Sequence, residues 1–257
     1  MNSPGLRLTL VVVSLTLLSW PGSVSGGESA DKKSEQPTQG LARLGIRCSP
    51  PDSGASPTGQ YKPSMHLRLA ADAYGRGSWG YAFREYKTAR FYHPEDPRDP
   101  EVLLMIADCA LMELRQLSDL MPCDLFPQGT YGKTVLSWLR ETYGFHPDAS
   151  EGDSFWHYDM RALRLFLRLY PDHDQADEVA YALAKEDLMF ARYDPAVFFV
   201  RDERALGCAR EFVSRYEDIL RRYPRTELKP KIESDIALFR GYTGSGGPLP
   251  KNIESPW

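Results

Sequence analysis

The residues of this chain that could do chemistry do not combine into a recognisable catalytic set. His157-Tyr-Asp159 places a histidine close to a carboxylate, but no nucleophile in a Gly-x-Ser-x-Gly context completes a triad. His146-Pro-Asp148 matches the tripeptide of chaperone J-domains, yet it follows an expected turn, and we interpret it as part of that loop. We therefore predict a protein without enzymatic activity and without a cofactor. An enzyme with an unrecognised site is the alternative.

The four cysteines, Cys48, Cys109, Cys123 and Cys208, do not form a metal-binding pattern. None of them has Cys-x-x-Cys spacing or neighbouring histidines, so we predict no metal site. Cys109 and Cys123 are close enough along the chain to link the end of a helix to the next loop, and this pair is a candidate disulfide. Cys208 falls on the apolar stripe of an expected helix, which predicts a buried small side chain.

Amphipathic helices that end at the same dipeptide organise the second half of the chain. One covers Arg161–Tyr170 and stops at Pro171, and another covers Cys208–Tyr223 and stops at Pro224. Each Tyr-Pro pair is followed by a short polar turn and then by further residues at helical spacing. Helix, stop and helix, repeated in this way, are typical of a helical repeat protein.

The first half contains a closer match to one known repeat unit. A helix is expected from about Pro63, and a second helix ends before Pro94. Small residues let these helices approach closely, and an aromatic ring between them fills the gap, a spacing that resembles the tetratricopeptide repeat. The positions that carry this pattern are Leu67, Ala70, Ala71 and Tyr74 in the first helix and Ala82, Tyr86 and Ala89 in the second.

An insertion interrupts the next repeat unit. Asp99 fits the N-cap of a third helix, but a loop at Met121–Thr130 separates that helix from its partner at about Lys133–Tyr143. The insertion covers about residues 116–150. We expect no strands, and we place the C-cap of the last helix at Gly241. The predicted fold class is all-α, with tetratricopeptide-like antiparallel helix pairs stacked in a short right-handed solenoid.

The N-terminus, residues 1–26, fits a secretory signal peptide. Arg7 precedes the apolar run Leu8–Trp20, which is too short for a comfortable membrane span, and cleavage is expected after Ser25 or Gly26. An uncleaved anchor is the alternative. We therefore expect an exported protein of the periplasm, in the cell envelope.

Composition divides the rest of the chain into three parts. These are a disordered linker at 27–61, a tetratricopeptide-like helical domain at 62–242 and a flexible C-terminal tail at 243–257. The chain has a formal net charge of −4, which argues against a nucleic-acid partner because such proteins usually carry a basic patch.

A peptide-binding groove is the candidate site of such a fold. In stacked helix pairs the first helix of each pair lines the concave side, and mixed aromatic, apolar and acidic side chains there would suit a peptide. The alternative is that these side chains pack against the insertion and leave no open groove. We expect a protein or peptide partner and no small-molecule substrate. The candidate groove residues are Leu67, Ala71, Tyr74, Glu101, Leu104 and Asp108.

A series of short motifs in the second half follows a distinctive order. The motifs are Phe166-Leu-Arg-Leu-Tyr-Pro171, Asp172-His-x-x-Ala176-Asp, Ala180-Tyr-Ala-Leu-Ala184, Arg201-Asp202, Ala209-x-x-Phe212 and Arg222-Tyr-Pro-Arg-Thr226. Their order is similar to that of the BamD-like family, tetratricopeptide-repeat lipoproteins of the bacterial β-barrel assembly machinery. The resemblance covers roughly 62–115 and 155–242. The lipobox cysteine of that family is missing, and the helical pattern ends near Tyr242, before the family's C-terminal repeats.

This resemblance implies a non-enzymatic scaffold or adapter of the bacterial cell envelope. Its role would lie in outer-membrane β-barrel protein assembly, with outer-membrane assembly components as partners and a position peripheral to the outer membrane. The alternative is a periplasmic interaction module that recruits an unrelated envelope complex, such as a cell-wall or secretion system.

Overall fold

The computed structural model describes residues 40–51, 63–120, 130–150, 153–189 and 203–245. All of them belong to one unit, Gln36–Trp257, and the other unit, Met1–Glu35, lies outside the described residues. The expected signal peptide, most of the expected C-terminal tail and the Arg201-Asp202 motif also lie outside them.

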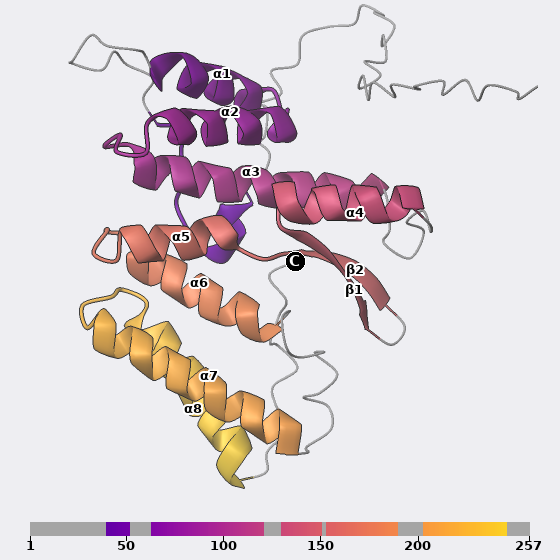
Figure 1. Cartoon of the computed structure of the whole chain (residues 1–257). Coiled ribbons are helices and arrows are strands. Elements are labelled where there is room, and N and C mark those ends of the chain that lie inside the picture. Colours follow the sequence, from indigo (N-terminus) through magenta and orange to yellow (C-terminus); the bar gives the residue numbers. More distant parts are fainter. Residues whose placement is uncertain (1–39, 52–62, 121–129, 151–152, 190–202, 246–257) are drawn as a thin grey trace, which may run out of the picture. The chain divides into compact units, whose positions relative to one another are not determined.

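The first two helices form a hairpin (Figure 1). α1 spans Pro63–Gly75 and α2 spans Trp79–Tyr92. Gly77 turns the chain between them with a φ of 72°, in the left-handed region that favours glycine. The ring of Tyr86 is fully buried on α2, between small residues of the same helix face. Both predicted helices are therefore confirmed.

α3 spans Asp99–Leu120 and lies at the centre of the larger core. It packs against both α2 and α5, which spans Arg161–Leu169. Asp99, the expected N-cap, is the first residue of the helix and is buried. It forms an ion pair with Arg90 of α2 at 2.8 Å, and the Tyr170 hydroxyl donates to its other oxygen at 2.7 Å. One carboxylate thus connects three helical segments.

A two-stranded antiparallel sheet follows α4 (Thr130–Thr142), with β1 at Phe145–Ser150 and β2 at Asp153–Tyr158. The helix expected here is confirmed, but the expectation of no strands is wrong. The physical reason is an alternation of period two. Phe145 lies opposite Tyr158, and both rings are buried together with Trp156, two positions earlier on β2. α4 packs against β1, and β2 packs against α3.

The last three helices are α6 at Ala176–Met189, α7 at Glu203–Arg222 and α8 at Lys229–Ser245, and they pack in sequence order after α5. α5 and α7 each end one residue before a Tyr-Pro pair, as predicted. The expected C-cap at Gly241 is wrong, because α8 continues to Ser245. The next residue, Tyr242, is buried on the apolar face of α8, and this burial favours a helical backbone through the glycine.

Residues 40–51 are structured, although the composition of 27–61 predicts a disordered linker. Leu41–Leu44 form a short 3-10 helix, η1, which packs against α3. Leu41 and Ile46 are 0% and 1% exposed. Burying two large aliphatic side chains stabilises the docked segment by several kcal/mol, on the order of 2 for each. The linker expectation is therefore wrong for residues 40–51.

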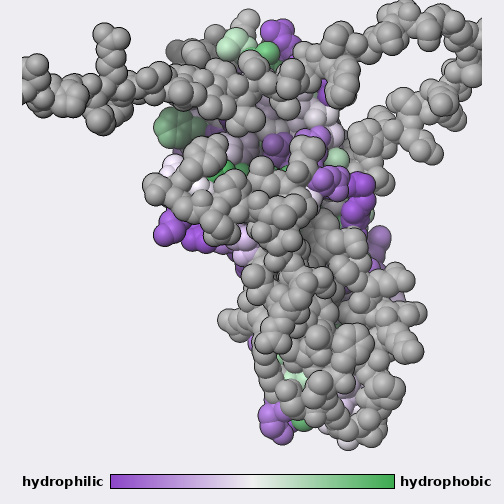
Figure 2. All heavy atoms as spheres, turned by 90° about the vertical axis from the view of Figure 1, so that its right-hand side faces the viewer, coloured by the Kyte–Doolittle hydropathy of each residue, from purple (hydrophilic) through white to green (hydrophobic). Residues whose placement is uncertain are grey.

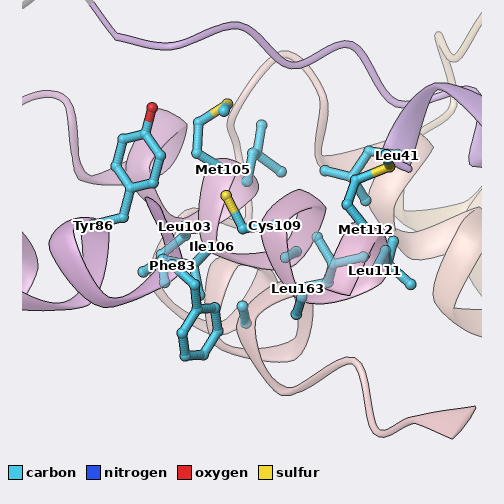
Figure 3. Close-up of a cluster of buried hydrophobic side chains, with 14 of the residues drawn as sticks. Leu41, Phe83, Tyr86, Leu103, Met105, Ile106, Cys109, Leu111, Met112 and Leu163 are labelled. Carbon is cyan, nitrogen blue, oxygen red and sulfur yellow. The ribbon is translucent and has the colours of Figure 1, made fainter. Parts of the chain in front are cut away.

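The hydrophobic core consists of a larger cluster, which extends from η1 to α6, and a smaller cluster formed by α6, α7 and α8. Figure 3 shows part of the larger cluster around α3. On the face drawn in Figure 2, the described residues at the surface are mostly hydrophilic. No helix within the described ranges is long and apolar enough to cross a membrane. The fold is mostly helical, with eight α-helices and one small sheet in the described part of the chain.

Candidate functional site

The six candidate groove residues are largely covered. Ala71 and Glu101 are partly exposed. The other four are buried, and they are Leu67, Tyr74, Leu104 and Asp108. An open groove lined by all six residues is therefore wrong.

Residues 40–48 cover the position where the groove was expected. The Leu41 amide donates to Asp108 Oδ1 at 2.6 Å, and the Tyr74 hydroxyl donates to Oδ2 at 2.6 Å. The Gly40 amide and the Cys48 thiol also donate to this carboxylate. Burial raises the pKa of Asp108, whereas these hydrogen bonds favour the charged form and lower it. The expected peptide-binding surface thus holds a segment of its own chain.

A small hollow remains beside this segment. It has a volume of about 340 Å³ and is lined by residues 47–49 together with Glu101, Leu104, Asp174 and Gln175. Two of the candidate groove residues therefore still border open space, but only at the edge of the docked segment.

The candidate disulfide between Cys109 and Cys123 is not formed, because Cys109 is a free thiol. Cys123 lies outside the described residues. Figure 3 shows Cys109 in the middle of α3, next to Met105 and Ile106. Its side chain is 0% exposed, and burial raises the pKa of the thiol well above its usual value. Cys208 is buried on α7, as predicted.

A larger cleft lies between α2, α3 and α5. Its volume is about 510 Å³, and Leu103 and Ile106 of α3 are among its apolar lining residues. Thr142, at the end of α4, and Tyr158, at the end of β2, also line it. The ring of Tyr143 packs on Phe83 at a centroid distance of 4.6 Å, which places the end of α4 against α2.

Five cationic side chains line this cleft, and among the described residues no carboxylate does. The cations come from α2 and α5 only. They are Lys87 and Arg90 on α2 and Arg161, Arg164 and Arg168 on α5. Positions three, four and seven residues apart share one helix face, so each helix turns a row of cations toward the cleft.

Carboxylates that lie outside the lining hold at least two of these cations. Arg90 is paired with Asp99, and Arg161 is paired with Asp159 at 2.7 Å. The hydrogen bond to Asp159 raises the pKa of Arg161. Arg161 also donates to the carbonyls of Glu141 at 2.9 Å and Arg140 at 2.8 Å, and so caps the C-terminal end of α4. Its position is therefore fixed by two elements.

Lys87 and Arg168 face the cleft with fewer constraints. Lys87 Nζ lies 3.4 Å from the carbonyl of Thr142 and 5.2 Å from the centre of the Phe83 ring. Burial, followed by the charge of Arg161, lowers the pKa of Lys87. Arg168 is exposed and has no ion-pair partner within the described residues. These two side chains are available to an anionic ligand.

The cations were not predicted as a site. From the sequence, the repeated arginines of the helices fit solvated faces, which is the usual place for such residues. The spacing of Arg161, Arg164 and Arg168 does put them on one face of a helix. It does not show that a second helix with Lys87 and Arg90 lies across from them.

The two histidine motifs meet at the β-hairpin. The rings of His146 and His157 stack across the β-hairpin with centroids 5.1 Å apart, and His146 Nε2 lies 3.6 Å from Asp159 Oδ2. In the described part of the chain, no group of three or more His, Cys, Asp or Glu side chains could hold a metal ion.

Comparisons with protein-family models, with curated proteins and with solved structures found no match for this chain.

Proposed function

We propose that this protein is a non-enzymatic helical scaffold that binds a segment of a partner protein. The observation that carries the proposal is the cleft between α2, α3 and α5, which combines an apolar floor with cations on both sides. Apolar surface supplies binding energy, and charged groups placed around it select and orient the partner. The consecutive helix pairs support a tetratricopeptide-like solenoid, the architecture we propose for this scaffold.

The cellular setting that we propose is the bacterial cell envelope. It rests on the signal-peptide pattern of residues 1–26 and on the motif order shared with the BamD-like family. On that basis the partner is a component of outer-membrane β-barrel assembly, and the alternative is an unrelated envelope complex. The intact mass of the mature chain tests export. A mature chain starting after Ser25 or Gly26 agrees with it, and one that retains Leu8–Trp20 contradicts it.

Co-purification of the tagged full chain from its native envelope tests the binding function. Reproducible recovery of a barrel-assembly component would support the role in β-barrel assembly. Recovery of a different envelope complex would support the alternative and contradict the proposed role in β-barrel assembly. If no protein is enriched over an untagged control, the scaffold proposal itself is overturned.

A further inference from the structure

The cleft lies where α2 and α5 pack against α3 from two sides. α1 packs with α2, α5 with α6, and α7 with α8, each pair being consecutive in the chain. α3 is followed by α4, but α4 packs against β1. A hollow of about 510 Å³ lies between the three helices α2, α3 and α5. Figure 1 shows these three helices one below another.

The walls of the hollow are positively charged in a chain whose overall charge is negative. Five cations line it, of which Arg90 pairs with Asp99 and Arg161 pairs with Asp159, and no carboxylate of the described residues lies in the lining. The chain as a whole has a formal net charge of −4. The local excess of positive charge therefore favours an anionic occupant, and the two rows of cations favour one with charges on both flanks.

The floor and one rim of the hollow are apolar. Leu103 and Ile106 of α3 line the floor, and Leu165 of α5 lies beside them. At the rim, the Phe91 side chain is 79% exposed, the largest exposure among the large hydrophobic side chains of the described residues. An exposed aromatic ring next to an apolar floor is the kind of anchor that protein interfaces use.

We propose that this cleft binds an acidic amphipathic helix of a partner protein, which lies in the cleft between the cations of α2 and those of α5. The apolar stripe of that helix covers the α3 floor and Phe91. Its carboxylates lie against the cations of α2 on one flank and of α5 on the other. This is the helix-in-groove mode of recognition, with the groove walls formed by helices. The proposal rests on the proposed function as a protein-binding scaffold and specifies its ligand.

A synthetic peptide can probe the cleft in the full chain. The probe is a peptide of about 15 residues, long enough for helix formation, with leucines at helical spacing between glutamates. Two control peptides keep its length. One has the same composition with the leucines moved off the stripe, and the other carries lysine in place of glutamate. Binding is measured by fluorescence anisotropy at low and high salt.

Matched variants place the binding in the cleft. Lys87→Glu combined with Arg168→Glu reverses the two least constrained cations. Arg210→Glu, at an exposed position of α7 outside the cleft, is the control for the same change of residue type. Phe91→Ala removes the exposed ring without changing charge. If the double variant does not fold, this variant tests whether the peptide binds in the cleft.

We expect the glutamate–leucine peptide to bind, and the double charge reversal to weaken binding at least about tenfold. Phe91→Ala should weaken it about fivefold, in line with interface aromatics, and high salt should weaken it as well. If the peptide without the leucine stripe binds equally well, the partner does not bind as an amphipathic helix and the proposal fails. If inorganic phosphate competes fully with the peptide, the cleft binds anions only, and the proposal fails as well. Unchanged binding in the double variant would show that the peptide does not bind in the cleft. If partners still co-purify in any of these cases, the scaffold function stands while this inference fails.

Discussion

The backbone amide of Leu41 donates a hydrogen bond to a carboxylate oxygen of Asp108 at 2.6 Å, although 67 positions separate the two residues. The other oxygen of the same carboxylate accepts from the Tyr74 hydroxyl at 2.6 Å. Asp108 thus binds the N-terminal segment through the amides of Gly40 and Leu41 and through the Cys48 thiol. The segment occupies the position where the sequence predicts a ligand groove, so the six candidate residues do not line an open groove there.

Replacing Asp108 by alanine should release residues 40–48 from α3. The Leu41 amide and the Tyr74 hydroxyl then lose their buried acceptor, at a cost of about 1–3 kcal/mol each. We expect urea titration to give a free energy of unfolding about 3 kcal/mol lower, and amide exchange to accelerate at 41–48. Asp72→Ala, at an exposed position of α1, is the control and should change the free energy of unfolding by less than about 0.5 kcal/mol. Unchanged exchange at 41–48 would show that Asp108 does not hold the segment.

The pKa of Asp108 predicts a pH dependence of stability. Burial raises this pKa above its ordinary value of 3.8, so the folded chain holds the proton more tightly than the unfolded chain. The corresponding stabilisation is present below 3.8 and is lost as pH rises through the folded pKa. The Asp108→Asn variant cannot ionise at this position, so it does not lose stability as pH rises. Urea titrations over a pH series should therefore show the variant gaining stability relative to the wild type as pH rises, and a constant difference would contradict the prediction.

A methyl group at position 40 has no room. A Cβ built on Gly40 would lie 2.8 Å from the Cβ of Leu111, so Gly40→Ala should push the segment away from α3 at a cost of about 1–3 kcal/mol. At Gly207, on α7, a Cβ would meet nothing within 4 Å, and Gly207→Ala should stabilise the helix by about 1 kcal/mol. Thermal melting compares the two variants. Shifts of the same sign would contradict the close approach of residue 40 to α3.

Arg161 should hold the end of α4 through the geometry of its guanidinium group. Arg161→Lys keeps the charge but loses the simultaneous hydrogen bonds to Asp159 and to the carbonyls of Arg140 and Glu141. We expect the last turn of α4 to exchange its amides about tenfold faster, as for the loss of hydrogen bonds worth about 1.4 kcal/mol. Arg210→Lys is the matched control. Equal exchange of α4 in both variants would mean that Arg161 does not cap this helix.

The helices were predictable because their signals are local. Apolar residues at helical spacing, closed by Tyr-Pro pairs, located α5 and α7, and the small residues around Tyr86 located α2. The β-hairpin was missed because its alternation extends over a few residues only, among histidine, proline and aspartate. The docking of residues 40–51 was missed because the composition of a segment averages over two anchoring side chains, Leu41 and Ile46.

The candidate site was harder to predict because it depends on contacts between distant segments. The groove residues follow from the repeat register of two consecutive units, and that register does not show that the Leu41 amide binds Asp108. The cationic cleft combines Lys87 of α2 with Arg168 of α5, two residues that sequence spacing does not relate. Each row of cations alone fits a solvated helix face. Only the packing of both helices against α3 makes them a site.

Reconstitution tests most directly the central claim that this protein acts by holding a partner protein. The partner recovered by co-purification is purified separately and titrated into the full chain by calorimetry, alongside the Lys87→Glu, Arg168→Glu double variant. We predict saturable binding to the wild-type chain and binding at least about tenfold weaker to the variant. The absence of binding between the purified wild-type chain and its partner would contradict the claim.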